Sequence, residues 1–348
     1  MSSTVSDNSI SASRQPTSGS WFFPRFILFP FLAMAAYPFF VLGAGGDHWA
    51  MQTVWILFLS YCWFCVGGSF HESVHETLFK YKWANVLYGR FLGVIIGIPY
   101  TTYKESHRCH HAYLNTPVDY ELWPYSDPNI SLGTRRVFIW VDLIFGVVTA
   151  PYIYARIFFL KDFPDSSKVR RAIFWEYMAL ILFWVFVFIA IYFLCHRHGE
   201  TVTPFNPLWV LPLFIAATTN TARKFVEHLG LKSSDPFLGT RTILPGNFIT
   251  KMLLYFNFDI AIHGPHHRYP HAQHNELPIK LKAYQALHPE LEIPVYRSYT
   301  SAFFSMIPLL WTFPATGGLQ KNFPQDSSSS SKEEEDNTNG KNNSSLSE

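Results

Sequence analysis

The sequence predicts an all-α integral membrane protein with four transmembrane helices and a cytoplasmic helical cap that carries clustered histidines. Three observations predict this fold class. Of the 348 residues, 49% are hydrophobic and only 15% are charged, whereas about 25% are charged in typical soluble domains. Several apolar runs are long enough to cross a bilayer. Eight of the 15 histidines fall into three short motifs, which indicates metal binding.

The two ends of the chain differ from its middle. Residues 1–20 are rich in Ser and Thr and lack the apolar stretch of a signal peptide, so we expect a disordered tail there. Residues 321–348 are polar and of low complexity, and we expect disorder there too. Residues 21–320 are then one membrane domain. Four cysteines are too few for a disulfide scaffold, and a net charge of +2 gives no basic excess for nucleic acid.

Four segments are predicted to cross the membrane. A spanning helix needs about 20 mainly apolar residues, and residues 25–45, 49–70 and 172–195 meet this requirement. The fourth segment, residues 207–222, is shorter but carries no charge. Three other apolar segments contain charges, glycines or prolines, so we expect them to lie in the interface or to re-enter without crossing. These are residues 85–100, 137–160 and 298–314.

Lysines and arginines predict the orientation, because they gather on the cytoplasmic side of membrane proteins. The loop between the first two spans, residues 43–48, has none, whereas residues 80–171 hold many. This pattern predicts a multi-pass protein with both termini and all three histidine motifs in the cytoplasm. It fits a bacterial cytoplasmic membrane and the endoplasmic reticulum equally.

The three histidine motifs predict two metal ions. Residues three and four positions apart share one helical face, so each motif can direct two or three imidazoles to one point. Imidazole is the commonest metal ligand in proteins, and eight imidazoles exceed the four ligands of a zinc ion. The motif residues are His71 and His75; His107, His110 and His111; and His263, His266 and His267.

The sequence contains further candidate histidines, and its first motif matches one other class of metal site. His228 follows the fourth predicted span on the same side of the membrane, and we expect it to be a ninth ligand. His271 and His274 are expected to support the site or to lie on the surface. The first motif also matches the His-Glu-x-x-His string of zinc proteases, but such a site would leave the other two motifs unexplained.

Taken together, the motifs resemble the membrane fatty-acid desaturase and hydroxylase superfamily, over about residues 25–290. The resemblance implies a di-iron site, cycling between Fe²⁺ and Fe³⁺, that uses O₂ to attack an unactivated C–H bond. Asn115, Asp119 and Glu121 resemble polar residues that often follow the second motif in this family. His228 lies where some members have an extra ligand. We expect Asn115, Asp119 and Glu227 to orient the imidazoles from outside the ligand set.

The same resemblance predicts partners, and the sequence departs from the family pattern at two positions. The substrate is expected to be a lipid or acyl chain from the bilayer. No His-Pro-Gly-Gly haem motif occurs, so electrons must come from a separate ferredoxin or cytochrome b5-type protein. The third motif begins with His263 instead of glutamine, unlike front-end desaturases. Lys224 stands where some relatives have an asparagine one turn before the extra histidine, which puts water-mediated coordination there in doubt.

Two classes of function stay open. The leading one is a fatty-acyl desaturase that introduces a C=C bond, with a hydroxylase or ketolase of a fatty acid, sphingolipid or carotenoid as its alternative. The motifs do not separate these reactions, because both begin with hydrogen abstraction. A non-enzymatic metal-binding protein or transporter would need ionisable groups within the spans. The predicted spans contain little of that kind beyond Glu176.

Overall fold

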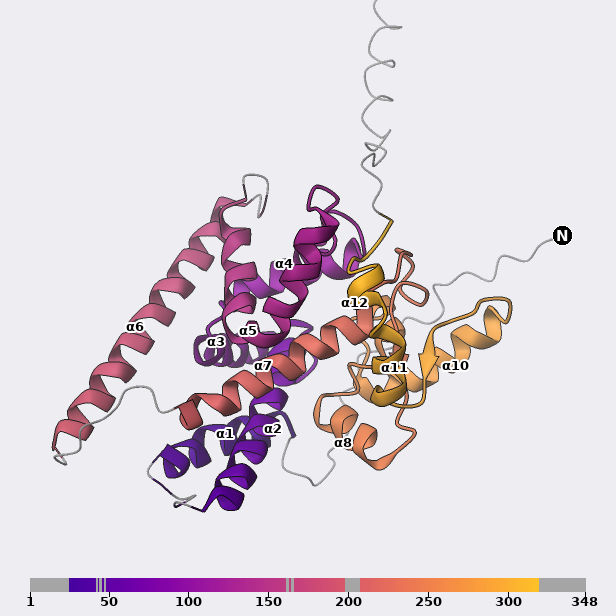
Figure 1. Cartoon of the computed structure of the whole chain (residues 1–348). Coiled ribbons are helices and arrows are strands. Elements are labelled where there is room, and N and C mark those ends of the chain that lie inside the picture. The colour runs from indigo at the N-terminus through magenta and orange to yellow at the C-terminus, as the bar shows by residue number, and fades with distance from the viewer. Residues whose placement is uncertain are drawn as a thin grey trace, which may run out of the picture.

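A computed structural model describes residues 25–318, except for residues 42, 44, 45, 47, 161, 162, 164, 165 and 198–206. The described chain is almost entirely helical (Figure 1). The tails predicted at residues 1–20 and 321–348 lie outside the described residues. The elements, in chain order, are α1 (Arg25–Val41), α2 (Trp49–Val74), α3 (Lys82–Ile96), α4 (Tyr100–Ala112), η2 (Tyr120–Leu122), α5 (Leu132–Phe158), α6 (Ser167–Arg197), α7 (Pro207–His228), β1 (Thr242–Ile243), α8 (Phe248–Phe256), α9 (His263–Arg268), η3 (His274–Glu276), α10 (Leu277–Leu287), β2 (Val295–Tyr296), α11 (Tyr299–Met306) and α12 (Leu309–Thr312).

Three helices are long and apolar enough to cross a membrane: α2, α5 and the Ser167–Ala190 part of α6. Of these, α2 and α6 contain the predicted spans at residues 49–70 and 172–195. Helix α1 is apolar but has only 17 residues, and α7, at the fourth predicted span, is not among the three. A mostly helical fold with apolar helices of membrane length is therefore confirmed. The count of four crossings and the cytoplasmic cap stay predictions.

Helix α5 is bent, although its length and composition suit a span. Phe145, in its middle, has non-helical backbone angles (φ −112°, ψ 31°). On the first arm, Arg135 donates a hydrogen bond to the carbonyl of Pro124, at 3.2 Å. On the second arm, the guanidinium of Arg156 lies 4.3 Å from the centre of the Trp123 ring. Both arms thus contact one short segment, residues 123 and 124. Re-entry of residues 137–160 without crossing stays a prediction.

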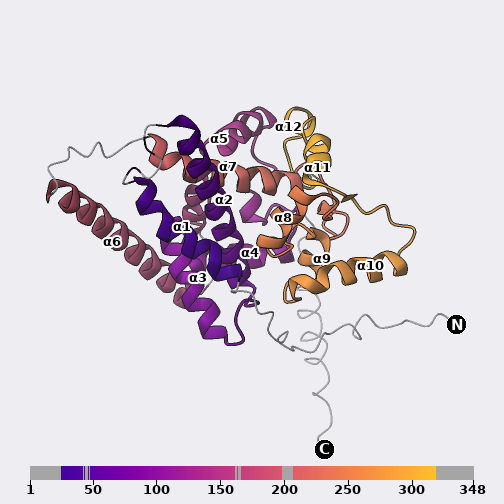
Figure 2. The same ribbon diagram turned by 90° about the horizontal axis from the view of Figure 1, so that it is seen from below.

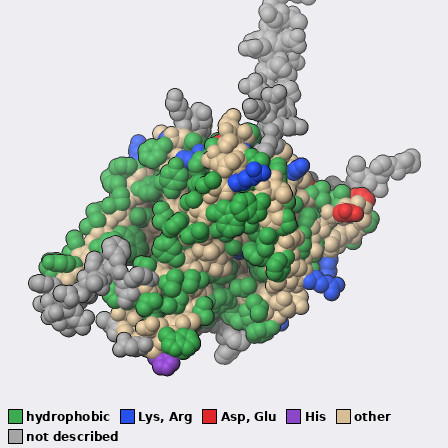
Figure 3. Space-filling model, in the orientation of Figure 1, with side chains coloured by type: hydrophobic (Ala, Val, Ile, Leu, Met, Phe, Trp, Pro, Cys, Tyr) green, Lys and Arg blue, Asp and Glu red, His purple; other side chains and the backbone are tan. Residues whose placement is uncertain are grey.

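Much of the outer surface is apolar. Helix α6 projects from the body of the molecule, and its Leu182, Phe186 and Phe188 side chains are 68%, 69% and 63% exposed (Figures 1 and 2). Hydrophobic side chains cover most of the face seen in Figure 3. Continuous apolar patches of this size are unfavourable in water, so this surface suits contact with lipid. An integral membrane protein follows from these features.

One carboxylate attaches the projecting helix to the body. Glu176 of α6 accepts hydrogen bonds from the backbone N and the Oγ1 of Thr101, at 2.7 and 2.6 Å, at the start of α4. It also forms a 2.8 Å salt bridge with Arg90 of α3. The ionisable group noted in the third predicted span therefore has a structural role, because these bonds hold α6 against α3 and α4.

Helix α2 is the central element, and α1, α3 and α7 all pack against it. The approach of α3 depends on glycine. A Cβ atom at Gly93 would lie 2.5 Å from the backbone oxygen of Ile98 and 3.2 Å from the ring of Phe70 on α2. A backbone oxygen cannot rotate away, so only glycine fits this position without a shift of the chain.

We expect Gly93→Ala to lower the thermal unfolding midpoint of the protein in detergent. Alanine in place of glycine favours a helix by about 1 kcal/mol, but overpacking of a close contact costs about 1–3 kcal/mol. Gly133→Ala is the matched control, because a Cβ atom at Gly133 meets only the Ser131 Oγ atom, at 3.8 Å. A midpoint for Gly93→Ala equal to or above that of Gly133→Ala would contradict the packing argument.

Candidate metal centre

All nine predicted histidine ligands meet where α2, α4, α7 and α9 converge. They form two groups, and within each group one ligand atom per ring lies within 4.8 Å of every other. Eight of the side chains are buried, and His111 is half-buried. The first group is His71, His75, His107, His111 and His266; the second group is His110, His228, His263 and His267.

Helical spacing explains this division. The first motif lies at the end of α2, where its two histidines, four residues apart, both join the first group. On α4, the pair four residues apart joins the first group, and His110 joins the second. On α9, the corresponding pair joins the second group, and His266 joins the first. Helices α4 and α9 therefore each contribute to both groups, because adjacent residues such as His110 and His111, or His266 and His267, point about 100° apart around a helix.

In the first group, bare nitrogen atoms face one another. The Nδ1 of His107 lies 2.8 Å from the Glu121 carboxylate and the Nδ1 of His111 lies 3.4 Å from the carbonyl of His267. Both partners can only accept, so each Nδ1 carries the proton and each Nε2 keeps a lone pair. These two Nε2 atoms are 3.0 Å apart, and the His107 Nε2 is also 3.0 Å from that of His75. Lone pairs at this distance repel unless a cation lies among them.

The second group has the same character. His110 donates through Nδ1 to Asp119, at 2.9 Å, and His263 donates through Nδ1 to the backbone carbonyl of Ile260, also at 2.9 Å. The Nε2 of His263 is therefore bare. It lies 2.8 Å from the Nε2 of His228 and 3.1 Å from the Nε2 of His267. The donor set of both groups is imidazole nitrogen, which suits Fe, Zn, Cu or Ni. The residues present fit one metal ion in each group.

The charge state of the site suits metal binding. Burial, followed by nearby positive charge, lowers the pKa of His111, His266 and His267 well below its ordinary value. These rings are therefore neutral at pH 7, which is the form that binds a metal. Burial would raise the pKa of Glu121, but His107 opposes it and lowers that pKa to about 2. Glu121 therefore remains an ionised acceptor for the His107 N–H group.

The predicted supporting residues have different positions. Asp119 is fully buried and accepts the N–H of His110. The side-chain amide of Asn115 instead donates to the backbone carbonyls of Ser233 and Gly239, at 2.8 and 2.9 Å. Asn115 therefore holds the loop over residues 233–239 against the second motif. The third such residue, Glu227, lies beside the second group and is considered below.

Glu121 supports the site although it is not among the three residues predicted to orient the imidazoles. It follows His111 by ten residues, and only the turn that contains η2 brings it back to His107. Asn115 lies in this turn with a positive φ of 58°, a conformation that asparagine tolerates. The one available signal was that Glu121 is an acid shortly after the second motif.

Lys224, His271 and His274 lie outside both groups. The Lys224 Nζ lies 2.8 Å from Asp142 on α5, so this side chain points away from the metal centre. Asp142 also accepts hydrogen bonds from Tyr125 and Thr149. His271 is exposed and contacts the backbone carbonyl of His75, at 3.3 Å. His274 contacts Arg25 and Asp259.

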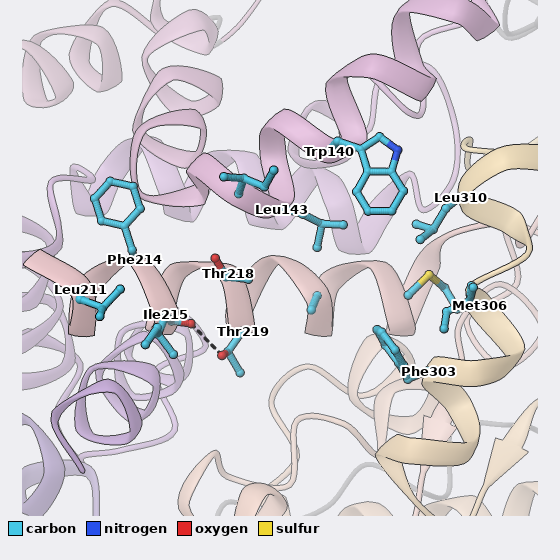
Figure 4. Close-up of a pocket in the computed structure, with 13 residues that line it drawn as sticks. Trp140, Leu143, Leu211, Phe214, Ile215, Thr218, Thr219, Phe303, Met306 and Leu310 are labelled. Atoms are coloured by element: carbon cyan, nitrogen blue, oxygen red, sulfur yellow. Dashed lines mark hydrogen bonds between the residues drawn. The ribbon is translucent and has the colours of Figure 1, made fainter. Parts of the chain in front are cut away.

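An apolar groove lies apart from the histidines, between α5, α7 and α11 (Figure 4). Its volume is about 760 Å³, and side chains such as Trp140, Phe214 and Phe303 line it. Met306 and Leu310 form its inner end and also belong to a buried core cluster. The groove contains none of the nine histidines, so it is a separate feature of the lipid-exposed surface.

Known proteins are similar to this chain in sequence. The chain is 23% identical over 270 residues to the sphingolipid delta(4)-desaturase DES1 of Mus musculus, covering 73% of this chain and 72% of that protein. It is 24% identical over 271 residues to the Homo sapiens protein of the same name, with the same coverage. A 129-residue segment is 33% identical to the Bos taurus protein, covering 32% of this chain and 36% of that protein.

A family match extends over most of the chain. The sequence model of the fatty acid desaturase family matches residues 47–299, a range that includes every histidine of the two groups. Together with the relatives, this match supports an oxidoreductase of desaturase type that acts on lipids. The chain belongs to the fatty acid desaturase family.

Proposed function

We propose that this protein is a membrane lipid desaturase that uses two iron ions and O₂ to introduce a C=C bond into an acyl chain. One observation carries the proposal: nine buried or half-buried imidazoles of a desaturase-family chain form two groups whose bare nitrogens converge. In the balanced reaction, a –CH₂–CH₂– unit and O₂, with two electrons and two protons, give –CH=CH– and two water molecules.

The metal pair would supply the chemistry that side chains lack, which is reduction of O₂ and removal of hydrogen from an alkyl carbon. The residues of the chain hold and shape this site. Nine imidazoles provide neutral nitrogen ligands, and Asp119 and Glu121 fix the ring orientation of His110 and His107 through their N–H groups. Burial of eight of the nine rings keeps bulk water out, which protects reactive species from side reactions.

The four-crossing topology is part of the proposal. The first motif, at the end of α2, and His228, at the end of α7, lie in one site, so both helices must end on the same side of the membrane. If α6 and α7 both cross between these two points, α5 cannot also cross, and its bend at Phe145 supports this arrangement. The loop lysines and arginines support a cytoplasmic location for this side and for both termini.

The substrate and electron donor follow from the same reasoning. The curated relatives are named as sphingolipid delta(4)-desaturases, so we propose a sphingolipid as the first substrate class to test, ahead of other acyl lipids. Electrons would come from a separate ferredoxin or cytochrome b5-type protein. His111 is the one half-buried ring of the nine. We therefore propose that electrons enter the site from the side on which His111 lies.

Metal content together with lipid profiling tests the proposed function. The protein is produced in a host of simple lipid composition, with and without added sphingolipid, and is purified in detergent. We expect about two irons per chain, one for each imidazole group, and a new lipid that is two mass units lighter. A new lipid sixteen mass units heavier would instead indicate that the reaction is hydroxylation and not desaturation. One zinc per chain, with no new lipid, would overturn the proposal.

A further inference from the structure

The two histidine groups are unequal. The first has five imidazoles and the second has four. All nine donors are imidazole nitrogens, so the second group has one donor fewer and neither group contains an anionic ligand. A doubly or triply charged ion in a buried site is stabilised when an anionic ligand offsets part of its charge. A missing fifth donor in the second group would therefore be expected to be a carboxylate.

Glu227 approaches the second group differently from the other acids. Asp119 and Glu121 both meet the protonated Nδ1 side of a histidine. The Oε2 of Glu227 instead lies 3.7 Å from the Nε2 of His263. Because His263 uses its N–H on the carbonyl of Ile260, this Nε2 is the bare, ligating side of the ring. The carboxylate of Glu227 thus lies on the side where the other nitrogens converge.

The surroundings of Glu227 leave one of its carboxylate oxygens without a hydrogen bond. The residue is only 2% exposed, and its Oε1 has no hydrogen-bond partner within the described part of the chain. Arg223 offsets part of the charge at a distance of 3.6 Å, which is longer than a hydrogen bond. A buried carboxylate in this state is costly unless a cation binds it. A metal ion in the second group would supply that cation.

We infer that the Glu227 carboxylate is a direct ligand of the metal ion in the second group, next to His110, His228, His263 and His267. This inference rests on the proposed two-iron function. It gives each group five protein donors, with nitrogen alone in the first and nitrogen plus one anionic oxygen in the second. It also replaces the expectation that Glu227 orients an imidazole from outside the ligand set.

The experiment compares full-length wild type with Glu227→Gln, Glu227→Asp and Glu176→Gln. Each protein is loaded anaerobically with ⁵⁷Fe²⁺ in detergent, and Mössbauer spectra and the rate of iron release to a chelator are recorded. Glu176→Gln is the matched control, because Glu176 is a mostly buried helical carboxylate bonded to Thr101 and Arg90. We expect it to behave like wild type.

For wild type we expect two irons per chain in two distinct quadrupole doublets of equal area. In Glu227→Gln, one iron should leave at least about tenfold faster, since loss of even an outer partner costs about 10–100-fold in affinity. One doublet should shift or vanish while the other stays unchanged. Glu227→Asp, which keeps the carboxylate, should lie between the two, and it carries the test if Glu227→Gln does not accumulate.

Three results would overturn the inference, and they are distinguishable. A wild type with two irons, beside a Glu227→Gln variant with the same release rate and the same two doublets, overturns the assignment of Glu227 alone. A wild type without an iron pair overturns the proposed function and the assignment with it. Faster release with both doublets unchanged would place Glu227 outside the ligand set, and so would also count against the assignment.

Discussion

Replacement of His107 by alanine is expected to abolish oxygen-dependent product formation, while the protein still inserts into the membrane. The Nε2 of His107 lies 3.0 Å from those of both His75 and His111, so its loss opens the first group at its most crowded point. It also leaves the half-buried Glu121 without its main partner. Loss of an outer partner costs about 10–100-fold in affinity, so we expect loss of this ligand to exceed about 100-fold in activity.

The measurement is lipid product per membrane-inserted chain, together with iron per purified chain. His288→Ala is the control, since His288 is a half-buried histidine outside both groups whose Nδ1 lies 3.4 Å from the carboxylate of the exposed Glu290. We expect that variant to retain both metals and full activity. If His107→Ala kept a tenth or more of the wild-type product, with two irons per chain, the first group would not be the reactive site.

The sequence was most informative about which residues come together. Histidines at i, i+3 and i+4 have a fixed relation on a helix, so the motifs alone predicted that several imidazoles converge. The structure brings all nine together, including His228, which comes from a helix far from the motifs in the chain. Their role as iron ligands stays a proposal, because proximity of imidazoles does not identify the ion.

The division into two groups was not predictable, because it depends on how the helices pack. The spacing on α4 shows that His110 differs in direction from its neighbours, but not which ring of α9 it meets. In the structure, His110 and His267 have ring centres 4.6 Å apart, although 157 positions separate them in the sequence. Contacts of this range follow from the packing of α2, α4 and α7 around one another, on which local periodicity carries no information.

The sequence is equally limited in what it predicts about the membrane topology of helix α5. Hydropathy over Leu132–Phe158 is that of a spanning helix, and the bend at Phe145 has no proline at that position to announce it. The next residue, Gly146, lies against α7, and a Cβ atom there would be 2.7 Å from the Thr221 hydroxyl. The path of α5 is therefore set by a tertiary contact. Whether α5 crosses the membrane stays a prediction, because hydropathy favours a crossing and the charges on the flanking loops favour re-entry.

Asp119 contacts His110, the residue of the second motif that belongs to the second histidine group. Both carboxylate oxygens lie within 3.0 Å of the His110 Nδ1. One of them also accepts from the backbone N of Asn115, at 3.2 Å, and the other accepts from that of Leu122, at 3.3 Å. Asp119 is fully buried, so no water can replace a bond that is lost. All four of these contacts require an acceptor.

Asp119→Asn keeps the size of the side chain but turns one acceptor into a donor. Whichever way the amide points, its NH₂ group meets the backbone N–H of Asn115 or of Leu122. If the NH₂ also faces His110, the proton of that ring must move to Nε2, which removes the lone pair that would bind the metal. We therefore expect metal affinity of the second group to fall by about 10–100-fold, with little change in the first.

Chelator competition on the loaded protein measures this effect, and Asp127→Asn is the control. Asp127 accepts the backbone N–H of Asn129 through one oxygen, at 2.9 Å, and an asparagine can keep that bond. Equal iron release from Asp119→Asn and Asp127→Asn would mean that Asp119 only closes the turn. Selective release of one iron from Asp119→Asn would instead show that the carboxylate fixes the tautomer of His110. Glu227→Gln should release the same iron, because both acids serve the second group, but from opposite sides of its histidines.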